Sequence, residues 1–312
     1  MNYNFCTLFD KNYLYKGLAL YNSLVEKHND FKLWILCMDD IAYQTLCKLN
    51  LKNTELIRLT EFEDKELLAV KPKRTTEEYC WTCAPSLTCY ILKKYNLDII
   101  SYIDADMYFY SSCKPIFDEL GDNSIMIIPH RFKQEDKHLE KTKGIYNVSM
   151  VSFKNNHDGI KALKWWRARC LEWCHHYYEN GKLGDQLYLN DWPERFNGVY
   201  VLKHLGANAA PWNISQYEIA EKTGKIFING MDLIFYHFHS LKIYSKRKFG
   251  LSYENYSLSD ACKKLIYKPY LVGLKIAIDQ INAVDKKFNY GFAKKPCIFA
   301  KTKKIIKKIL KI

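Results

Sequence analysis

Two aspartates separated by one alanine, Asp104 and Asp106, interrupt an apolar run in "DIISYIDADMYFY" (98–110). In a regular strand, residues two apart point to the same face, where two carboxylates would be costly inside a core. They are tolerated where the strand ends and both face a cation. Hard divalent cations take oxygen ligands and leave positions for substrate phosphates, so the pair predicts a Mg²⁺ or Mn²⁺ site facing a diphosphate. A solvated Asp-x-Asp loop is the alternative interpretation.

Two histidines alternate in a later segment, "FYHFHSLK" (235–242). His237 and His239 would share one face of a strand. An imidazole can complete a Mn²⁺ site begun by two carboxylates, and Lys242 would then offer a positive charge to a phosphate. Two half-buried histidines in a rim strand are the alternative, which the pattern leaves open.

A third polar segment, "GDQLYLND" (184–191), begins at a turn glycine. Asp185 is a plausible cap for a short helix over 184–192. The functional interpretation instead puts Asp185 and Gln186 at the mouth of the site. The two roles are compatible, and the segment itself does not separate them.

Strand-like and helix-like segments alternate through the first half of the chain. This alternation predicts an α/β protein with a mostly parallel sheet and helices on both faces. Ligands of such sheets bind beyond the carboxyl ends of the strands, where Asp10, Asp104 and Asp106 fall. The expected strands cover 4–10, 31–40, 54–59, 98–110, 124–129, 145–155 and 233–242, and the expected helices cover 14–28, 41–50, 77–95 and 159–180.

From about residue 246 the sequence becomes basic and helix-leaning. We therefore expect a main domain over 1–245 and a basic helical C-terminal appendage over 246–312. Its last segment, 294–312, carries eight lysines and no acid, and lysine pairs alternate there with Ile/Leu pairs. That amphipathic pattern predicts contact with an anionic membrane surface. A solvated or docked terminal helix is the alternative.

The net charge of +13 falls to +5 without those eight lysines, so the basicity belongs mainly to the tail. A nucleic-acid-binding body is not indicated, and no nucleic-acid motif occurs. The N-terminus lacks a secretory signal pattern, and no apolar run is long enough for a membrane span. Eleven cysteines without a framework suit reduced thiols. These features predict a cytoplasmic protein, peripheral on the inner face of the membrane.

Two further motifs have structural interpretations that we favour. Cys80 and Cys83 have the spacing of a redox or zinc pair, but they lie inside a helical pattern, so core thiols are expected. His175 and His176 would end the helix over 159–180, where cations suit the helix dipole.

Together these segments resemble the GT-A fold glycosyltransferases of family 8, the retaining galactosyltransferase and glycogenin group, as a divergent member. The resemblance covers roughly residues 4–242. It implies a nucleotide-sugar donor, with uridine diphosphate as the expected carrier, and a Mn²⁺ or Mg²⁺ cofactor. "TLFDKNYLYKGLALYNSL" (7–24) is similar to the family's nucleoside segment, which implies donor-binding roles for Asp10, Asn12 and Tyr13.

The resemblance also implies roles for the motifs above. "YIDADMYFY" matches the metal-binding Asp-x-Asp element. "YNVSMVSFKN" (146–155) implies that Asn147 lies beside the donor sugar. "DQLYLN" (185–190) implies catalytic positions for Asp185 and Gln186 flanking the reacting sugar. "HFHSLK" (237–242) resembles a His-x-x-Gly-x-x-Lys element, which implies His237 as third metal ligand, with His239 competing, and Lys242 on the diphosphate.

The sequence departs from the family pattern at three places. Ser240 stands at the family's glycine, and Lys242 falls one position early without the usual Pro-Trp. The family's sugar-contacting arginine aligns with Trp81, for which Arg74 or Lys73 would substitute. Fold and nucleotide-sugar use therefore follow more directly than stereochemistry.

The predicted function is metal-dependent sugar transfer, with retention favoured, to a glycan or lipid-linked saccharide in cell-surface polysaccharide or lipooligosaccharide assembly. An inverting enzyme would instead need a carboxylate base near the acceptor, for which Glu77, Glu78 and Asp191 are candidates. The competing predictions are a sugar-phosphate nucleotidyltransferase and an inactive membrane-associated scaffold.

Overall fold

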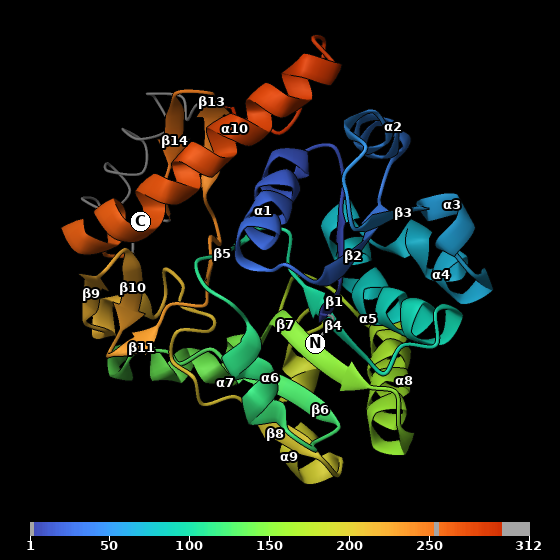
Figure 1. Cartoon of the computed structure of the whole chain (residues 1–312). Helices are drawn as coiled ribbons and strands as arrows, with labels where there is room; N and C mark the ends of the chain where they lie inside the picture. Colours follow the sequence, from blue (N-terminus) through green and yellow to red (C-terminus); the bar gives the residue numbers. More distant parts are fainter. Residues whose placement is uncertain (1–2, 253–255, 295–312) are drawn as a thin grey trace, which may run out of the picture.

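A seven-stranded sheet with helices on both faces forms the centre of the computed structural model, which describes residues 3–252 and 256–294 (Figure 1). Its strands are β1 (Tyr3–Phe9), β2 (Phe31–Cys37), β3 (Thr54–Arg58), β4 (Ile99–Ile103), β6 (Ile125–Pro129), β7 (Tyr146–Lys154) and β8 (Val199–Val201). The order is β3-β2-β1-β4-β7-β6-β8, and only β7 runs antiparallel to its neighbours. The predicted α/β class with a mostly parallel sheet is confirmed.

Alternate residues of the central strands enter two different cores, as the two-residue period of a buried strand requires. Phe5 and Phe9 of β1 pack into the first core, and Cys6 and Leu8 pack into the second. The first core takes side chains from α1 (Leu14–Lys27), α2 (Asp40–Leu49), α6 (Lys114–Leu120) and α10 (Lys268–Val284). The second takes them from α3 (Leu59–Phe62), α4 (Lys65–Val70), α5 (Thr76–Lys94), α8 (His157–Glu172) and α9 (Trp192–Arg195).

The strand order places a topological switch point between β1 and β4. From β1 the chain winds outward through β2 and β3, then returns to add β4 on the other side. Ligands of open α/β sheets bind beyond the carboxyl ends of the strands at such a point. Asp10 follows β1 and Asp104 follows β4, and the reversed direction of β7 brings Asn147 to the same edge.

The expected strand over 98–110 is interrupted, and the interruption holds the two aspartates. The chain turns after β4, with the Met107 amide donating to the Asp104 carbonyl oxygen at 3.3 Å. It then continues as β5 (Met107–Phe109), which pairs antiparallel with β12 (Phe235–His237) outside the main sheet. The expected strand over 233–242 is also only partly formed, because β12 ends at His237 and a turn follows, with a φ of +65° at Ser240.

The described part of the C-terminal region belongs to the main core. A hairpin of β13 (Lys242–Ser245) and β14 (Lys248–Gly250) crosses the expected boundary at 245. A π-helical segment, η5 (Cys262–Tyr267), leads into α10, which lies alongside α1 (Figure 1). The described region thus contains a hairpin as well as helices, and the inner side chains of η5 and α10 share the first core.

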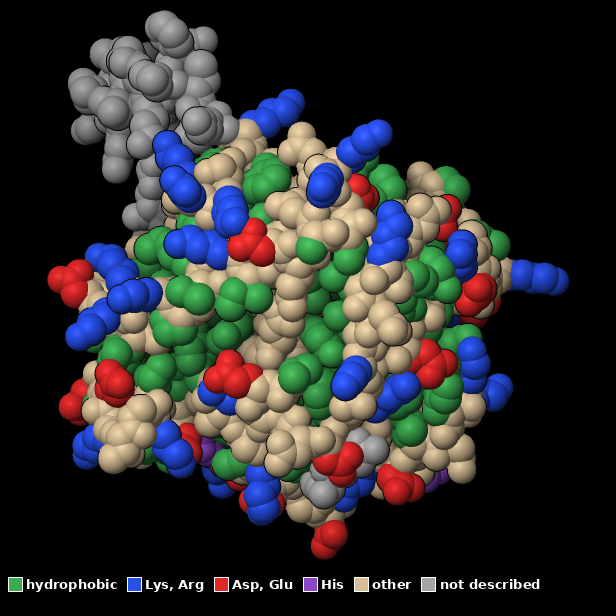
Figure 2. Space-filling view, turned by 45° about the horizontal axis from the view of Figure 1, so that its top comes forward, with side chains coloured by type: hydrophobic (Ala, Val, Ile, Leu, Met, Phe, Trp, Pro, Cys, Tyr) green, Lys and Arg blue, Asp and Glu red, His purple; other side chains and the backbone are tan. Residues whose placement is uncertain are grey.

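The surface around α10 is basic, as the sequence predicts. Residues 256–294 include seven lysines and three aspartates. Figure 2 brings the top of Figure 1 forward and shows lysine and arginine side chains spread over this face, with hydrophobic ones between them. The lysine-rich segment 295–312, for which membrane contact is predicted, lies outside the described residues, and no described helix is long and apolar enough to span a membrane.

The other elements are short and connect or cover the main layers. The short helical elements are η1 (Lys71–Lys73), η2 (Gln134–Leu139), α7 (Glu140–Lys143), η3 (Leu187–Leu189) and η4 (Ile214–Gln216). The strands β9 (Ile219–Lys222), β10 (Lys225–Ile228) and β11 (Met231–Asp232) form a separate three-stranded sheet.

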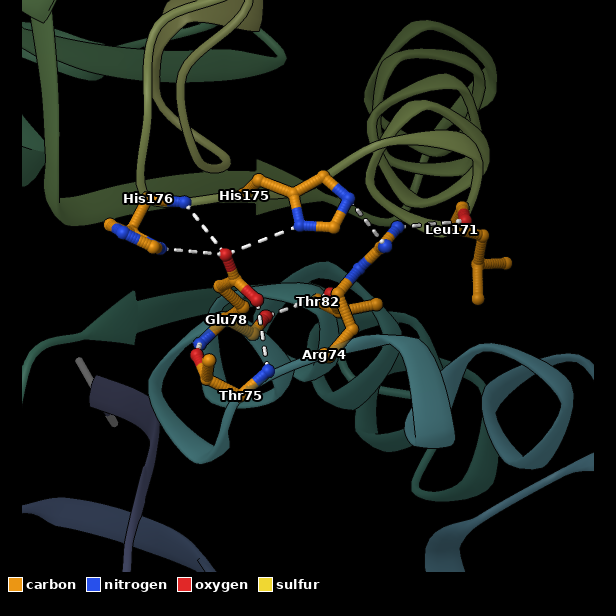
Figure 3. A network of polar contacts seen from close by, with 7 residues as sticks. All are labelled: Arg74, Thr75, Glu78, Thr82, Leu171, His175 and His176. Atoms are coloured by element: carbon orange, nitrogen blue, oxygen red, sulfur yellow. Dashed lines mark hydrogen bonds and ion pairs between the residues drawn. The ribbon is translucent and has the colours of Figure 1, made fainter.

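A buried carboxylate, Glu78, fastens the loop after α8 to the start of α5 (Figure 3). One Glu78 oxygen accepts the Thr75 amide at 2.8 Å and closes a capping box. The other accepts the His176 amide at 3.0 Å, the His176 ring at 2.9 Å and the His175 ring at 3.2 Å. The loop fastened in this way leads directly to Asp185 and Gln186.

The predicted position of the two histidines is therefore wrong. The helix ends at Glu172 rather than near 180, so His175 and His176 lie in the loop and bind a carboxylate instead of a helix dipole. Arg74 donates to Nε2 of His175 at 2.9 Å, which requires that His175 carry its proton on Nδ1.

Truncation of one α10 side chain tests whether the C-terminal region is part of the main fold. We expect Ile281→Ala, at a fully buried position, to lower the free energy of unfolding by about 2–5 kcal/mol. Ile276→Ala is the matched control, because Ile276 lies on the same helix and is 49% exposed. Urea unfolding of both variants measures the difference. Equal and small effects would mean that α10 is a loosely attached appendage.

The Glu78 contacts predict a pH-dependent stability. Burial would raise the pKa of Glu78, but hydrogen bonds from Thr75 and the two histidines outweigh it and lower that pKa to about 2. The charged carboxylate therefore stabilises the folded state at pH values above the ordinary pKa of a glutamate. This stabilisation is lost as the pH falls toward 2. We expect Glu78→Gln to cost on the order of 3 kcal/mol at pH 7.

Urea unfolding at pH 7, 5 and 3 measures this contribution. The difference between wild type and Glu78→Gln should shrink between pH 5 and pH 3, whereas Glu77→Gln, at the exposed neighbour, should have a small effect throughout. A cost for Glu78→Gln that stays constant over this range would contradict a charged Glu78 as the source of the stability.

Candidate functional site

A cavity of about 860 Å³ opens at the switch point, beyond the carboxyl ends of β1 and β4. Segments far apart in the sequence form its wall, including Asp10, the turn at 104–106, the loop at 183–186 and residues 237, 239 and 240. The Phe, Tyr and Trp side chains that line it are Phe9, Tyr13, Trp81, Tyr102, Phe132, Trp212 and Tyr256. The cavity therefore combines a polar end with rings that suit a base or a sugar.

Asp104, Asp106 and His237 form a compact group of potential metal ligands at the polar end. One ligand atom of each lies within 4.8 Å of the others. His237 Nε2 is 3.1 Å from an Asp106 oxygen and 3.8 Å from an Asp104 oxygen. Ligand atoms about 3 Å apart suit adjacent positions around a small divalent cation, whose bonds to oxygen are about 2.1 Å. Two carboxylates and an imidazole therefore fit the predicted Mg²⁺ or Mn²⁺.

Burial and charge act differently on the two aspartates. Burial raises the pKa of Asp104 to about 6, although the charge of His237 opposes the rise. Burial acts on Asp106 too, but His237 and Lys16 outweigh it and hold the pKa of Asp106 well below its usual range. Asp106 is thus an anion at all moderate pH values, and Tyr102 donates a hydrogen bond to Asp104 at 3.1 Å.

The structure separates the two histidines that the sequence left as competitors. His237 ends β12 and faces the aspartates, whereas His239 lies in the following turn and is not a member of the three-residue group. Both rings meet Trp212 edge-on. Burial and the nearby His237 lower the pKa of His239 to about 4, so His239 is neutral in the wall of the cavity.

Lys16 is a site residue that sequence reasoning missed. It lies on α1, is 7% exposed, and its ammonium is 3.5 Å from the second oxygen of Asp106. Burial lowers the pKa of Lys16, and the charge of Asp106 opposes that change. The available signal was a lysine among the apolar residues of an otherwise buried helical segment, where an unpaired charge would be costly.

A second polar cluster lies beside the aspartates. The Asn147 amide donates to Gln186 at 3.3 Å, and Gln186 donates to the Lys143 carbonyl oxygen at 2.8 Å. Asp185 is buried, and burial together with the charge of Asp104 raises its pKa to about 8. The expected capping role of Asp185 is wrong, because η3 begins after Gln186 and has no side-chain cap.

The predicted nucleoside segment lines the same cavity, next to the metal-ligand group. Asp10, Asn12 and Tyr13 all contribute to the wall. Asp10 accepts hydrogen bonds from the Asn12 amide at 2.9 Å and from its side chain at 2.8 Å, which fixes the turn between β1 and α1.

Two predicted cationic residues do not line the cavity. Arg74 is turned toward His175 and the Leu171 carbonyl oxygen, in the network of Figure 3. Lys242 is exposed at the start of the β13 hairpin. The cavity wall instead contains Lys143, a residue outside every motif that we identified. Ser240 adopts a left-handed backbone, which agrees with its alignment to the family's glycine.

Comparison with known proteins gives two close relatives, although no family model matches the chain. The chain is 33% identical over 299 residues to YfnD of Bacillus subtilis (strain 168), covering 95% of this chain and 96% of YfnD. It is 34% identical over 299 residues to YfnF of the same strain, covering 93% of this chain and 97% of YfnF. Both relatives are uncharacterized proteins.

Solved structures share the fold at much lower identity. The galactosyltransferase LgtC, in complex with donor and acceptor sugar analogs, has a TM-score of 0.52 at 16% identity, covering 87% of this chain and 95% of LgtC. The apo glycosyltransferase GlyE of Streptococcus pneumoniae TIGR4 has a TM-score of 0.52 at 13% identity, covering 93% and 65%. The fold is thus the GT-A fold. Because the identity to YfnD and YfnF extends over almost the whole length of each protein, the chain belongs to the family of YfnD and YfnF.

Proposed function

We propose that the protein is a metal-dependent glycosyltransferase that uses a nucleoside-diphosphate sugar, and that it is a divergent relative of family 8. The observation that carries the proposal is the group of Asp104, Asp106 and His237 at the switch point of a GT-A fold. Two carboxylates and an imidazole beside an aromatic-lined cavity suit a divalent cation on a diphosphate. We propose uridine as the base and Mn²⁺ or Mg²⁺ as the ion, as the family resemblance implies.

The proposed donor lies along the cavity from β1 to the second polar cluster. Asp10, Asn12 and Tyr13 would hold the nucleoside, and the three metal ligands would hold the ion, which neutralises charge on the leaving diphosphate. Lys143 is better placed than Lys242 to add a positive charge, because Lys143 lines the cavity.

The donor sugar would then lie against Asn147, Asp185 and Gln186, which are hydrogen-bonded neighbours or adjacent in the chain. The sugar carbon becomes cation-like during transfer, and the Gln186 side-chain oxygen and Asp185 would be the polar groups that stabilise it. We favour retention of configuration, with Gln186 and Asp185 as the catalytic residues.

Among the three carboxylates considered for an inverting mechanism, the structure favours one. Glu78 is fully engaged with Thr75, His175 and His176. Asp191 pairs with Arg195 away from the cavity. Glu77 lines the cavity and is exposed, so it is the remaining candidate base if transfer inverts configuration.

Rings such as Trp81 and Trp212 in the wall suit a saccharide, and a glycan or lipid-linked saccharide of the cell surface remains our proposed acceptor. Placement of the protein at an anionic membrane surface on the inner face stays a prediction, because it depends on residues 295–312.

Nucleotide binding tests the proposal. We expect calorimetry to detect Mn²⁺-dependent binding of one of UDP, GDP and CDP, with UDP preferred, and Asp104→Ala to weaken it at least about tenfold because a metal ligand is lost. Asp118→Ala, at an exposed carboxylate of α6, is the control and should bind as wild type does. Binding of none of the three nucleotides with any metal would favour the scaffold.

The two histidine variants test the assignment of the third ligand. We expect His237→Ala to weaken Mn²⁺-dependent UDP binding by about 10- to 100-fold, because Nε2 of His237 faces both carboxylates. His239→Ala should weaken it far less, since His239 lies outside the ligand group. The same titrations measure both, and a larger loss for His239→Ala would reverse the assignment.

A further inference from the structure

Lys16 lies behind the metal-ligand group rather than in the cavity. Lys16 is buried on α1 and is not among the residues that line the cavity. Its ammonium is 3.5 Å from Asp106 and 4.3 Å from the centre of the Tyr13 ring. Its position is therefore fixed by α1 and by two contacts, and a substrate entering the cavity would not meet it first.

The two oxygens of Asp106 have different partners. One oxygen is 3.1 Å from Nε2 of His237, on the side of the metal-ligand group, and the other is 3.5 Å from Lys16. Lys16 therefore contacts the oxygen of Asp106 that is not paired with His237, so its positive charge lies on the same carboxylate that faces the metal-ligand group.

The ammonium also changes the charge that an incoming cation meets. Asp104 and Asp106 together supply two negative charges, and Lys16 cancels one of them at close range. In a buried site such a charge is poorly screened, so it acts strongly on an ion held by Asp106. A diphosphate brings further negative charge and oxygen ligands to the same ion.

We propose that Lys16 is a built-in counter-charge that keeps the affinity of the site for a free divalent cation low, so that the ion is bound together with the diphosphate. The inference rests on the proposed function, because it takes the cation and the diphosphate from it. Lys16 acts through Asp106 and is a positioning residue. Lys16 affects the affinity for the cation in the absence of a diphosphate, and it does not contact the reacting atoms.

A purely structural role for Lys16 makes a different prediction. If Lys16 only compensated the cost of burying Asp106, its removal would destabilise the fold and disorder the carboxylate. Metal affinity would then fall. If Lys16 is a counter-charge, its removal raises metal affinity, because the cation takes over the compensation of Asp106. The sign of the change in affinity separates the two roles.

The test measures Mn²⁺ binding to the full chain by electron paramagnetic resonance of the free ion, without nucleotide and with saturating UDP. We expect wild type to bind Mn²⁺ at least about tenfold more weakly without UDP than with it. Lys16→Met should bind Mn²⁺ alone at least about tenfold more tightly than wild type. Lys16→Arg, which keeps the charge, and Lys114→Met, which removes an exposed lysine, should resemble wild type.

The outcomes are distinct. Tight Mn²⁺ binding by wild type without UDP, or an affinity in Lys16→Met that is unchanged or weaker, overturns the inference and leaves the proposed function intact. Absence of Mn²⁺ binding from every variant, with and without UDP, overturns both. Thermal unfolding establishes that each variant is folded. If Lys16→Met is not folded, Lys16→Gln replaces it with the same expected gain in Mn²⁺ affinity.

Discussion

The buried carboxylate of Asp106 is the constraint on which the cavity depends. An isolated carboxylate away from water is very costly, so it persists only with opposite charge or hydrogen-bond donors around it. Lys16 of α1 and His237 of β12 supply that compensation from two sides. Both α1 and β12 are thereby held to the turn at 104–106, which follows β4. The positions of α1, β4 and β12 therefore depend on one another.

The ribbon of β5 and β12, which begins directly after Asp106 and ends at His237, is too small to be stable by itself, since an isolated two-stranded pair is marginal in water. Its support comes from α10. Tyr270 stacks on Phe238 with ring centres 3.7 Å apart, and the Phe238 amide donates to the Asp106 carbonyl oxygen at 2.9 Å. Gly273 lets α10 approach closely, because an added Cβ would lie 3.0 Å from the Tyr108 ring. The helix α10, which was expected to belong to an appendage, therefore packs against the segment that holds Asp106 and His237 in place.

The sequence was informative wherever local pattern decides the outcome. Alternating strands and helices up to β4 follow from periodicity, and Asp104 and Asp106 were placed correctly at a strand end because acids are costly inside a buried strand. The interruption itself was missed, since "DIISYIDADMYFY" favours extended structure throughout, and only pairing of β5 with distant β12 decides where it turns. The end of α8 was missed for a similar reason: the pattern continues past Glu172, but Glu78 captures His175 and His176.

Other parts of the site had no local signature that could locate a partner. The lysine at position 16 was visible as a charge among apolar residues, yet nothing in its neighbourhood indicates Asp106. Lys143 and the inner face of α10 likewise acquire their roles only when the chain is folded. His237 could be singled out only through the family resemblance, because in an uninterrupted strand His239 would have been its equal.

The stacking of Tyr270 on Phe238 also has a consequence for the order in which the protein is completed during synthesis. Chains leave the ribosome from the N-terminus, so β1 to β4 are available to pack long before α10. At that stage Lys16 and Asp106 have emerged, whereas the ring that supports the segment around His237 has not. The corner formed by Asp104, Asp106 and His237 therefore gains its support from α10 only after the first strands of the sheet have been synthesised.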